Sequence, residues 1–291
     1  MNDIHSWEAF MLIVENLSKE YPLFKLNNIS FQLPKGYIMG FIGMNGAGKT
    51  TTLKSMLNLV KPDSGTVTIL GKDVADSEVE IKQEIGFMLG EADYYSKSKV
   101  KKIANVYKRF FKEWDEKAYQ NYLTRFGVDE SKMISELSSG MRVKLAIAFA
   151  LSHKAKLLIF DEPTSGLDPI ARDEMLDLFH EIVEDGEKSI IFSTHITSDL
   201  DKCADFIIFI RNGELIANTS KDDLIADHIL VAGKKSDLTD ELKNRLIGFK
   251  LNAFGFIGLM HKNNMLDTDM LQTEIPNLED IMIYYNKEEQ K

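Results

Sequence analysis

Apolar residues along this chain fall into short runs that are separated by turn residues and by longer stretches with a helical period. The short runs predict strands at residues 11–16, 28–33, 37–42, 66–70, 156–160, 189–194 and 206–210. Pro34-Lys35-Gly36 and Pro62-Asp63-Ser64-Gly65 are turns between them. Strands that alternate with helices predict an α/β fold with a mostly parallel sheet that is covered on both faces.

The middle of the chain has the apolar spacing of helices. Between residues 100 and 114 we expect one helical stripe, made by Val100, Ile103, Val106, Tyr107, Phe110, Phe111 and Trp114. A second aromatic segment, 119–126, ends at Gly127, a plausible helix stop, and a third helix covers 141–151, just after Gly140. We interpret the aromatic residues as core, within a helical subdomain over about residues 90–152.

The pattern changes again near residue 226. Residues 228–233 are typical of a strand, residues 254–260 are apolar and glycine-rich, and residues 276–285 indicate a short closing helix. We therefore divide the chain into an N-terminal extension (1–10), a large domain (11–225) and a small C-terminal accessory module (226–291).

Composition places the chain among ordinary globular proteins, with 291 residues, 44% hydrophobic and 27% charged. Its apolar runs fall well short of the ~20 residues that span a bilayer. The first ten residues include Asp3 and Glu8 and do not resemble a secretion signal, so we expect a cytosolic protein. Cys203 is a single cysteine, which excludes an internal disulfide; we expect it to be a half-buried helix residue.

The formal net charge of −10 argues against a general nucleic-acid surface. One segment departs from this balance, because every ionised residue between 97 and 112 is basic: Lys97, Lys99, Lys101, Lys102, Lys108, Arg109 and Lys112. The segment is either the solvated face of an amphipathic helix or a surface that lies near anionic lipid headgroups.

Residues 43–50, Gly-Met-Asn-Gly-Ala-Gly-Lys-Thr, match the phosphate-binding pattern G-x-x-x-x-G-K-[ST]. The glycines let the backbone curl so that successive N–H groups converge on an anion. Lys49 supplies a cation for the terminal phosphates, and Thr50 supplies a hydroxyl for Mg²⁺. An apolar strand at 37–42 precedes the loop and a helix at 51–59 follows it, so the N-terminus of that helix is directed at the phosphates.

A second group of motifs follows downstream. The apolar strand at 157–160 ends in Asp161 and Glu162, which are suited to hold Mg²⁺ and an attacking water. Leu137-Ser138-Ser139-Gly140-Met141 precedes this strand, Ser165-Gly166-Leu167-Asp168 follows it, and Ser193-Thr194-His195 ends the next strand. Asp168 also suits the N-cap of a helix that begins at Pro169.

In order and spacing, these motifs resemble the nucleotide-binding subunit of ABC transporters over residues 11–222. The resemblance implies a P-loop NTPase fold with an ABC-type ATPase core, and ATP and Mg²⁺ as cofactors. It implies that Glu162 polarises the attacking water, that His195 touches the γ-phosphate and that Asp168 communicates across a dimer interface. Thr50 and Asp161 would bind the metal. The ATP-binding residues that it implies are Tyr21 (beneath adenine), Gly43, Asn45, Gly46, Ala47, Gly48, Lys49, Thr50 and Thr51.

The chain departs from the family at two places. In the signature motif, Ser138 and Gly140 match the residues that close over the ATP of a second subunit, whereas Ser139 and Met141 replace a glycine and a glutamine. Ser139 is small enough to preserve the close approach, but Met141 loses an amide. The glutamine that family members carry after the strand at 85–89 is replaced by Glu91, which can serve as an oxygen ligand to Mg²⁺.

The resemblance implies an ATPase subunit that powers a separate transmembrane permease, works with a second identical or sister ATPase subunit, and lies peripherally on the cytoplasmic face of the membrane. Similarity to ATPases of small bacterial exporters favours export of amphipathic peptides (including the phenol-soluble modulin type), antibiotics or lipids over import. The alternative is an ABC ATPase that acts on ribosomes or DNA, and a third reading is a kinase or GTPase with the same loop. We expect no nucleic-acid partner. The third reading leaves Leu137 to Gly140 and His195 unexplained.

Overall fold

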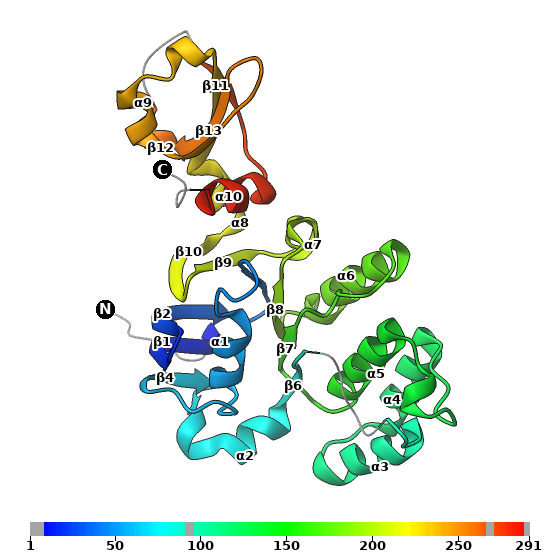
Figure 1. Cartoon of the computed structure of the whole chain (residues 1–291). Coiled ribbons are helices and arrows are strands. Elements are labelled where there is room, and N and C mark those ends of the chain that lie inside the picture. Colours follow the sequence, from blue (N-terminus) through cyan, green and yellow to red (C-terminus); the bar gives the residue numbers. More distant parts are fainter. Residues whose placement is uncertain (1–8, 91–95, 266–270, 288–291) are drawn as a thin grey trace.

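The computed structural model describes residues 9–90, 96–265 and 271–287. It contains a large α/β unit, a helical region on one side of it and a smaller sheet-containing unit at one end (Figure 1). Within the described residues, none of the helices has both the length and the apolar character needed to cross a bilayer.

A six-stranded sheet forms the centre of the large unit, in the order β10-β9-β3-β8-β7-β6. The strands from β9 to β6 in this order are parallel, whereas β10 runs antiparallel to β9. Each residue of the central strands β3, β7 and β8 is buried, as expected for a sheet that is covered on both faces. The strands are β3 (Ile38–Ile42), β6 (Ile85–Met88), β7 (Leu157–Asp161), β8 (Ser189–Thr194), β9 (Phe206–Arg211) and β10 (Glu214–Ser220).

The two faces of this sheet have different covers. Side chains such as Phe160 and Phe192 face one core, which they share with α5 (Ser139–Leu151), α6 (Pro169–Val183) and α7 (Thr197–Cys203). Their neighbours Ile159 and Ile191 face the other core, which includes α1 (Lys49–Met56), α2 (Val74–Glu84) and a second, antiparallel sheet. The prediction of a mostly parallel, doubly covered sheet is confirmed, but a sheet as well as helices covers the second face.

That second sheet has the order β2-β1-β4-β5, with β1 (Phe10–Tyr21), β2 (Phe24–Pro34), β4 (Ser64–Ile69) and β5 (Lys72–Asp73). Strands β1 and β2 are longer than the apolar runs at 11–16 and 28–33. Asn16 and Asn28 have positive φ angles of 52° and 55°, and the β1–β2 register shifts between Val14 and Leu17. The alternation of apolar residues breaks at these irregularities, so the sequence pattern predicts strands that are shorter than the observed β1 and β2.

The helical region consists of α3 (Val100–Phe110), α4 (Glu116–Phe126) and α5, and its core is aromatic, as predicted. Phe149 stacks on Tyr107 at a centroid distance of 4.3 Å. Gly127 ends α4 with φ 65°. Helix α5 begins at Ser139, earlier than the predicted start after Gly140, because Ser138 caps it.

The single apolar stripe predicted over residues 100–114 is wrong. Helix α3 ends at Phe110, because Phe111 adopts an extended conformation. The side chain of Gln83 stabilises this end: it donates a hydrogen bond to the Phe110 carbonyl and accepts one from the Lys112 N–H. Phe111 and Trp114 turn back toward the core, where Phe111 stacks on the buried His153 at 3.9 Å. Val106 is 52% exposed and Phe110 is 74% exposed, so the stripe is buried only in part.

The C-terminal unit is an antiparallel sheet in the order β12-β13-β11-β14. Val231, Leu242, Leu246, Phe256 and Met260 form a core of its own. Strand β11 covers the predicted run 228–233, and α10 lies within the predicted closing helix 276–285. The elements are α8 (Lys221–Ala226), β11 (His228–Gly233), α9 (Asp240–Arg245), β12 (Leu246–Leu251), β13 (Phe256–His261), β14 (Gln272–Glu274) and α10 (Leu278–Tyr285).

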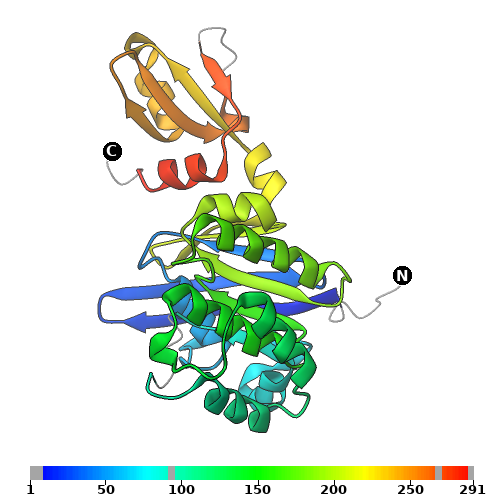
Figure 2. The same cartoon turned by 90° about the vertical axis from the view of Figure 1, so that its right-hand side faces the viewer.

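Helix α10 lies between the small sheet and the large unit (Figure 2). Its residues Leu278 and Ile281 belong to the same apolar cluster as Leu200 and Cys203 of α7. Cys203 is therefore 2% exposed rather than half-buried, and burial raises the pKa of its thiol to about 12. We propose 225/226 as the domain boundary, with α10 as the contact that seats the module on α7.

Replacing Ile281 with alanine is expected to weaken this seating, because Ile281 is 1% exposed and its loss leaves a cavity that costs about 2–5 kcal/mol. Limited proteolysis should then cut more rapidly near residue 227, between α8 and β11. Ile283→Ala is the matched control on the same helix, since Ile283 is 39% exposed. Equal protease sensitivity of the two variants would contradict the role of α10.

Candidate functional site

The phosphate-binding segment connects β3 to α1, as the sequence predicts. Gly46 and Gly48 have φ angles of 83° and 116°, in the region that side chains disfavour, and Gly48 is the N-cap of α1. A Cβ atom at Gly43 would lie 2.4 Å from the Ile210 carbonyl oxygen. The loop therefore needs glycine for its backbone turn at two positions and for close packing on β9 at a third. Because Gly48 caps the helix, α1 begins at Lys49, two residues before the predicted start.

Lys49 lies inside the loop, and only 6% of its surface is exposed. Its Nζ donates to the Gly43 carbonyl at 2.7 Å and to the Met44 carbonyl at 3.5 Å, and it lies 3.6 Å from Glu162 Oε1. Burial lowers the pKa of Lys49, against the opposing effect of the Glu162 and Asp161 charges. This buried ammonium can interact strongly with anionic phosphates at the mouth of the loop.

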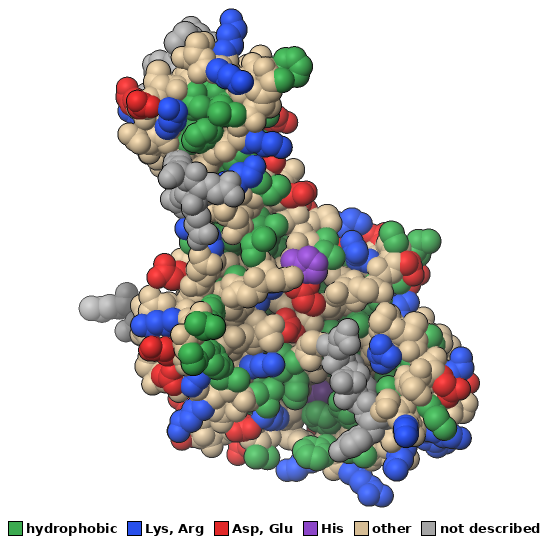
Figure 3. Space-filling model, in the orientation of Figure 1, with side chains coloured by type: hydrophobic (Ala, Val, Ile, Leu, Met, Phe, Trp, Pro, Cys, Tyr) green, Lys and Arg blue, Asp and Glu red, His purple; other side chains and the backbone are tan. Residues whose placement is uncertain are grey.

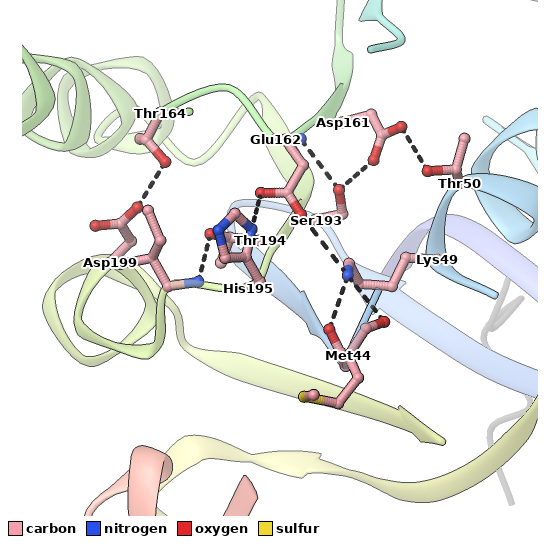
Figure 4. Close-up of polar contacts among 12 residues, drawn as sticks. Met44, Lys49, Thr50, Asp161, Glu162, Thr164, Ser193, Thr194, His195 and Asp199 are labelled. Carbon is pink, nitrogen blue, oxygen red and sulfur yellow. Dashed lines mark hydrogen bonds and ion pairs between the residues drawn. The ribbon is translucent and has the colours of Figure 1, made fainter. Parts of the chain in front are cut away.

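Thr50 and Asp161 meet beside the lysine, at the ends of α1 and β7. Thr50 Oγ1 donates to Asp161 Oδ2 at 2.8 Å, and Ser193 Oγ of β8 donates to Asp161 Oδ1 (Figure 4). Neighbouring ligands of an octahedral Mg²⁺ are about 2.9 Å apart, given metal–oxygen distances of about 2.05 Å. The hydroxyl and the carboxylate thus have the spacing and the chemistry that Mg²⁺ requires. Within the described residues no cluster of three or more His, Cys, Asp or Glu side chains suits a metal.

Glu162 and His195 form the next layer of the site. Glu162 has a positive φ of 54°, and its N–H donates to both Oγ and the carbonyl oxygen of Ser193. His195 Nδ1 lies 2.8 Å from Glu162 Oε2. A carboxylate only accepts hydrogen bonds, so Nδ1 carries the proton and Nε2 is left for another partner. Figure 4 shows Glu162 between Lys49 and His195, with one oxygen directed toward each.

A cavity of ≈ 480 Å³ opens over the loop. It is lined by Leu23, Phe24, Met44, Asn45, Gly46, Gly48, Lys49, Thr50, Thr51 and Glu162. Tyr21, the predicted contact to adenine, is not among these residues; it lies 39% exposed at the end of β1, with its ring centroid 6.5 Å from that of Phe24. Ala47 is buried against the second core rather than lining the cavity. Glu91 lies outside the described residues.

The signature residues lie apart from this cavity, on the exposed tip of α5. Ser138 Oγ accepts from the Met141 N–H at 3.2 Å and so caps the helix. A Cβ atom at Gly140 would lie 3.1 Å from Leu167, so a glycine lets this tip pack on the loop before α6. Asp168 caps α6, and the N–H groups of Ala171 and Ile170 hold the pKa of its carboxyl below the usual range. Ser138, Ser139 and Asp168 are all exposed.

Comparison with known proteins places this site in a family. Residues 26–165 match the family model described as ABC transporter. The bacitracin transport ATP-binding protein BcrA of Bacillus licheniformis is 33% identical over 212 residues, which cover 72% of this chain and 69% of that protein. The chain belongs to the ABC transporter family of ATP-binding proteins.

Solved structures agree with this assignment. An ATP-binding subunit of an ABC transporter superposes with a TM-score of 0.68 at 26% identity, covering 74% of this chain and 92% of that one. The fold also matches the ATP-binding cassette MJ0796, solved as a dimer in a post-hydrolysis state with ADP and Pi, with a TM-score of 0.66 at 21% identity over 72% of this chain and 98% of that one.

As an ABC transporter ATPase, the chain binds nucleotide, hydrolyses ATP and serves transport. The predicted fold class and the predicted function as a transport ATPase are confirmed, in preference to action on ribosomes or DNA. ATPases of this family work as dimers and together with a transmembrane component. The roles of the individual site residues remain predictions.

Two residues of this site, Thr164 and Asp199, were not named from the sequence, and Ser193 was named only as part of a motif, without a role. Ser193 links Asp161 to the Glu162 backbone, and the buried Asp199 of α7 accepts from Thr164 Oγ1 at 2.6 Å. The loop after β7 is thus bonded through Thr164 to Asp199 of α7 and through Glu162 to His195, which lies two residues before α7 (Figure 4). The available signal was a polar residue, Ser193, within the apolar run of β8; Thr164 and Asp199 carry no comparable signal.

Thr164→Val is expected to lower kcat about 10-fold with little change in ATP affinity, because the Asp199 carboxylate loses its donor and the loop that carries Glu162 loses its hydrogen bond to α7. Thr164→Ser keeps the hydroxyl and should restore the rate. Steady-state ATPase assays and nucleotide titrations measure the two effects. Equal kcat values for the valine and serine variants would rule out positioning by this hydrogen bond.

Proposed function

We propose that this chain is the ATP-hydrolysing subunit of a bacterial-type exporter for amphipathic peptides, antibiotics or lipids. The relative BcrA is named for bacitracin transport, which supports export of an amphipathic antibiotic. The transported molecule is selected by the permease, a separate transmembrane chain. In this arrangement the ATPase lies peripherally on the cytoplasmic face of the membrane and needs no nucleic acid.

The observation that carries the catalytic part is the contact of Lys49, Glu162 and His195 beside Thr50 and Asp161. Groups suited to phosphate, to metal and to water thus share one site. Mg²⁺ held by Thr50 and Asp161 would neutralise charge on the β- and γ-phosphates. Glu162 accepts a proton from the attacking water, whose oxygen bonds to the γ-phosphorus as the bond to the β-phosphate oxygen breaks and ADP leaves.

We further propose that two ATPase subunits close over the nucleotide. The tip of α5 is exposed and is not part of the cavity of its own chain, so it is available to the ATP of a partner. Its exposed N-terminus, with Ser138 and Gly140, offers N–H groups and a hydroxyl to a γ-phosphate. Asp168, which lies exposed at the start of α6, is placed at the same surface because its loop packs on this tip.

Lys49→Ala is expected to weaken ATP binding about 10- to 100-fold, because the phosphates lose a charge-assisted donor. A titration with a fluorescent ATP analogue measures the affinity. Lys54→Ala, which changes the last turn of the same helix, is the control. Wild-type affinity in the Lys49 variant would refute the proposed phosphate site.

Glu162→Gln is expected to bind ATP but to hydrolyse it about 10²–10⁴-fold more slowly, because an amide cannot accept a proton from water. ATP that persists should hold two subunits together, and light scattering with and without the permease detects the dimer. A variant that remains monomeric with ATP in both conditions would contradict closure over the nucleotide.

A further inference from the structure

Helix α3 exposes a mixed basic and apolar face, which we call the α3 face. It consists of Lys102, Val106, Arg109 and Phe110, and of Lys112 just beyond the helix end. Val106 lies four residues after Lys102, three before Arg109 and four before Phe110, so it neighbours all three on the helix surface. Val100, Ile103 and Ala104 of the same helix are buried. Phe110 lies two helical turns after Ile103, on nearly the same side, but at the end of the helix that is left exposed. Phe110 is 74% exposed and Val106 52%, so apolar surface lies among cations that point to solvent.

The cations around this helix are mostly without acidic partners. Lys101 pairs with Glu130 at 3.3 Å and Lys108 with Glu116 at 2.9 Å. Within the described residues, no ion pair involves the other five basic residues of the segment, namely Lys97, Lys99, Lys102, Arg109 and Lys112. Residues 97–112 themselves contain no Asp or Glu, although the whole chain carries a net charge of −10. The segment is a local positive field on an acidic protein.

The end of the α3 face is held in place. Gln83 of α2 donates from Nε2 to the Phe110 carbonyl at 3.0 Å and accepts at Oε1 from the Lys112 N–H at 3.0 Å. Val79 lies one helical turn before Gln83 on α2 and is 78% exposed. Helices α2 and α3 therefore both expose apolar side chains near the end of α3. The two hydrogen bonds of Gln83 fix the backbone that carries Phe110 and Lys112.

The α3 face also lies at a distinctive place in the molecule. Helix α3 is at the end opposite the C-terminal unit, with the nucleotide-binding core between them (Figure 1). In the space-filling view, Lys and Arg side chains gather along the lower edge of the helical region (Figure 3). A flat anionic surface approaching this end meets the cations and Phe110 without contacting the C-terminal unit.

We propose that the α3 face binds anionic lipid headgroups, with Phe110, Val106 and Val79 entering the interface between headgroups and acyl chains. Clusters of Lys and Arg next to exposed apolar side chains have the chemistry of such contacts. The charge complementarity favours a lipid surface because the cations are spread along the helix from Lys102 to Lys112. The proposal extends the membrane placement proposed above, but vesicle binding requires neither permease nor ATP, so the two can fail separately.

The test is flotation of the full chain with vesicles of phosphatidylglycerol or of zwitterionic phosphatidylcholine. Wild type should float with the anionic vesicles only. The triple variant Lys102→Gln, Arg109→Gln, Lys112→Gln should bind them roughly 100-fold more weakly, since each cation near an anionic surface contributes about 5-fold. Phe110→Ser should lose about 10-fold. Salt at about 1 M should release the wild type, because the Debye length falls to about 3 Å.

A matched control separates the local face from the overall charge. Lys234→Gln, Lys235→Gln, Lys250→Gln removes the same charge from exposed residues of the C-terminal unit and should bind like wild type. Nucleotide affinity, which none of these residues touches, reports that every variant is folded. Equal losses in both triple variants, or no flotation of wild type with anionic vesicles, would overturn the proposal. The proposal would also be overturned if the variant Lys102→Gln, Arg109→Gln, Lys112→Gln floats normally but its ATPase rate is no longer stimulated by the permease. An acidic segment of the permease would then bind the α3 face.

Discussion

A lysine ammonium that is removed from water needs negative charge or hydrogen-bond acceptors close by, and Lys49 has both. Two loop carbonyls and the Glu162 carboxylate surround its Nζ atom, with Asp161 contributing a second charge. This arrangement exists only because β3 and β7 end at the same edge of the sheet, on either side of β8. The candidate catalytic site therefore depends on one constraint, the parallel register of three buried strands.

The sheet supports this constraint through two separate cores. On one face, Phe160 and Phe192 pack on Phe179 of α6. This packing fixes the position of α6, the helix that Asp168 caps. On the other face, Leu53 and Met56 of α1 pack among residues of the antiparallel sheet and fix the helix that begins at Lys49. The elements that flank the nucleotide site are thus anchored from opposite sides, and the polar side chains meet at the edge between the two cores.

The C-terminal unit is connected to the same machinery through α7. This helix begins two residues after His195, contains Asp199 and packs on α10. His228 and Tyr285 add a polar contact between the start of β11 and α10, with 3.0 Å between His228 Nε2 and the Tyr285 hydroxyl. Through this packing the C-terminal unit contacts the helix that follows His195, and its residues Leu230 and Leu259 belong to the same apolar cluster as Leu200 of α7.

Motifs with strict local spacing could be predicted from the sequence. The phosphate-binding loop, Asp161, Glu162 and His195 stand at the ends of apolar runs, and parallel strands bring such ends together. The cap of α6 by Asp168 and the helix stop at Gly127 follow from local backbone preferences in the same way.

Residues that act through distant partners gave no such signal. Asp199 meets Thr164 across 35 positions of sequence, and Gln83 ends α3 from another helix, which turned a predicted single stripe into a helix with an exposed end. The sequence by itself thus determined the family and the fold class, and it predicted the residues of the candidate site, because these depend on local order and periodicity. Only the tertiary structure decided which side of α3 faces solvent, which hydrophobic residues border the nucleotide cavity and how the C-terminal unit is seated, because each depends on packing between segments that are far apart in the chain.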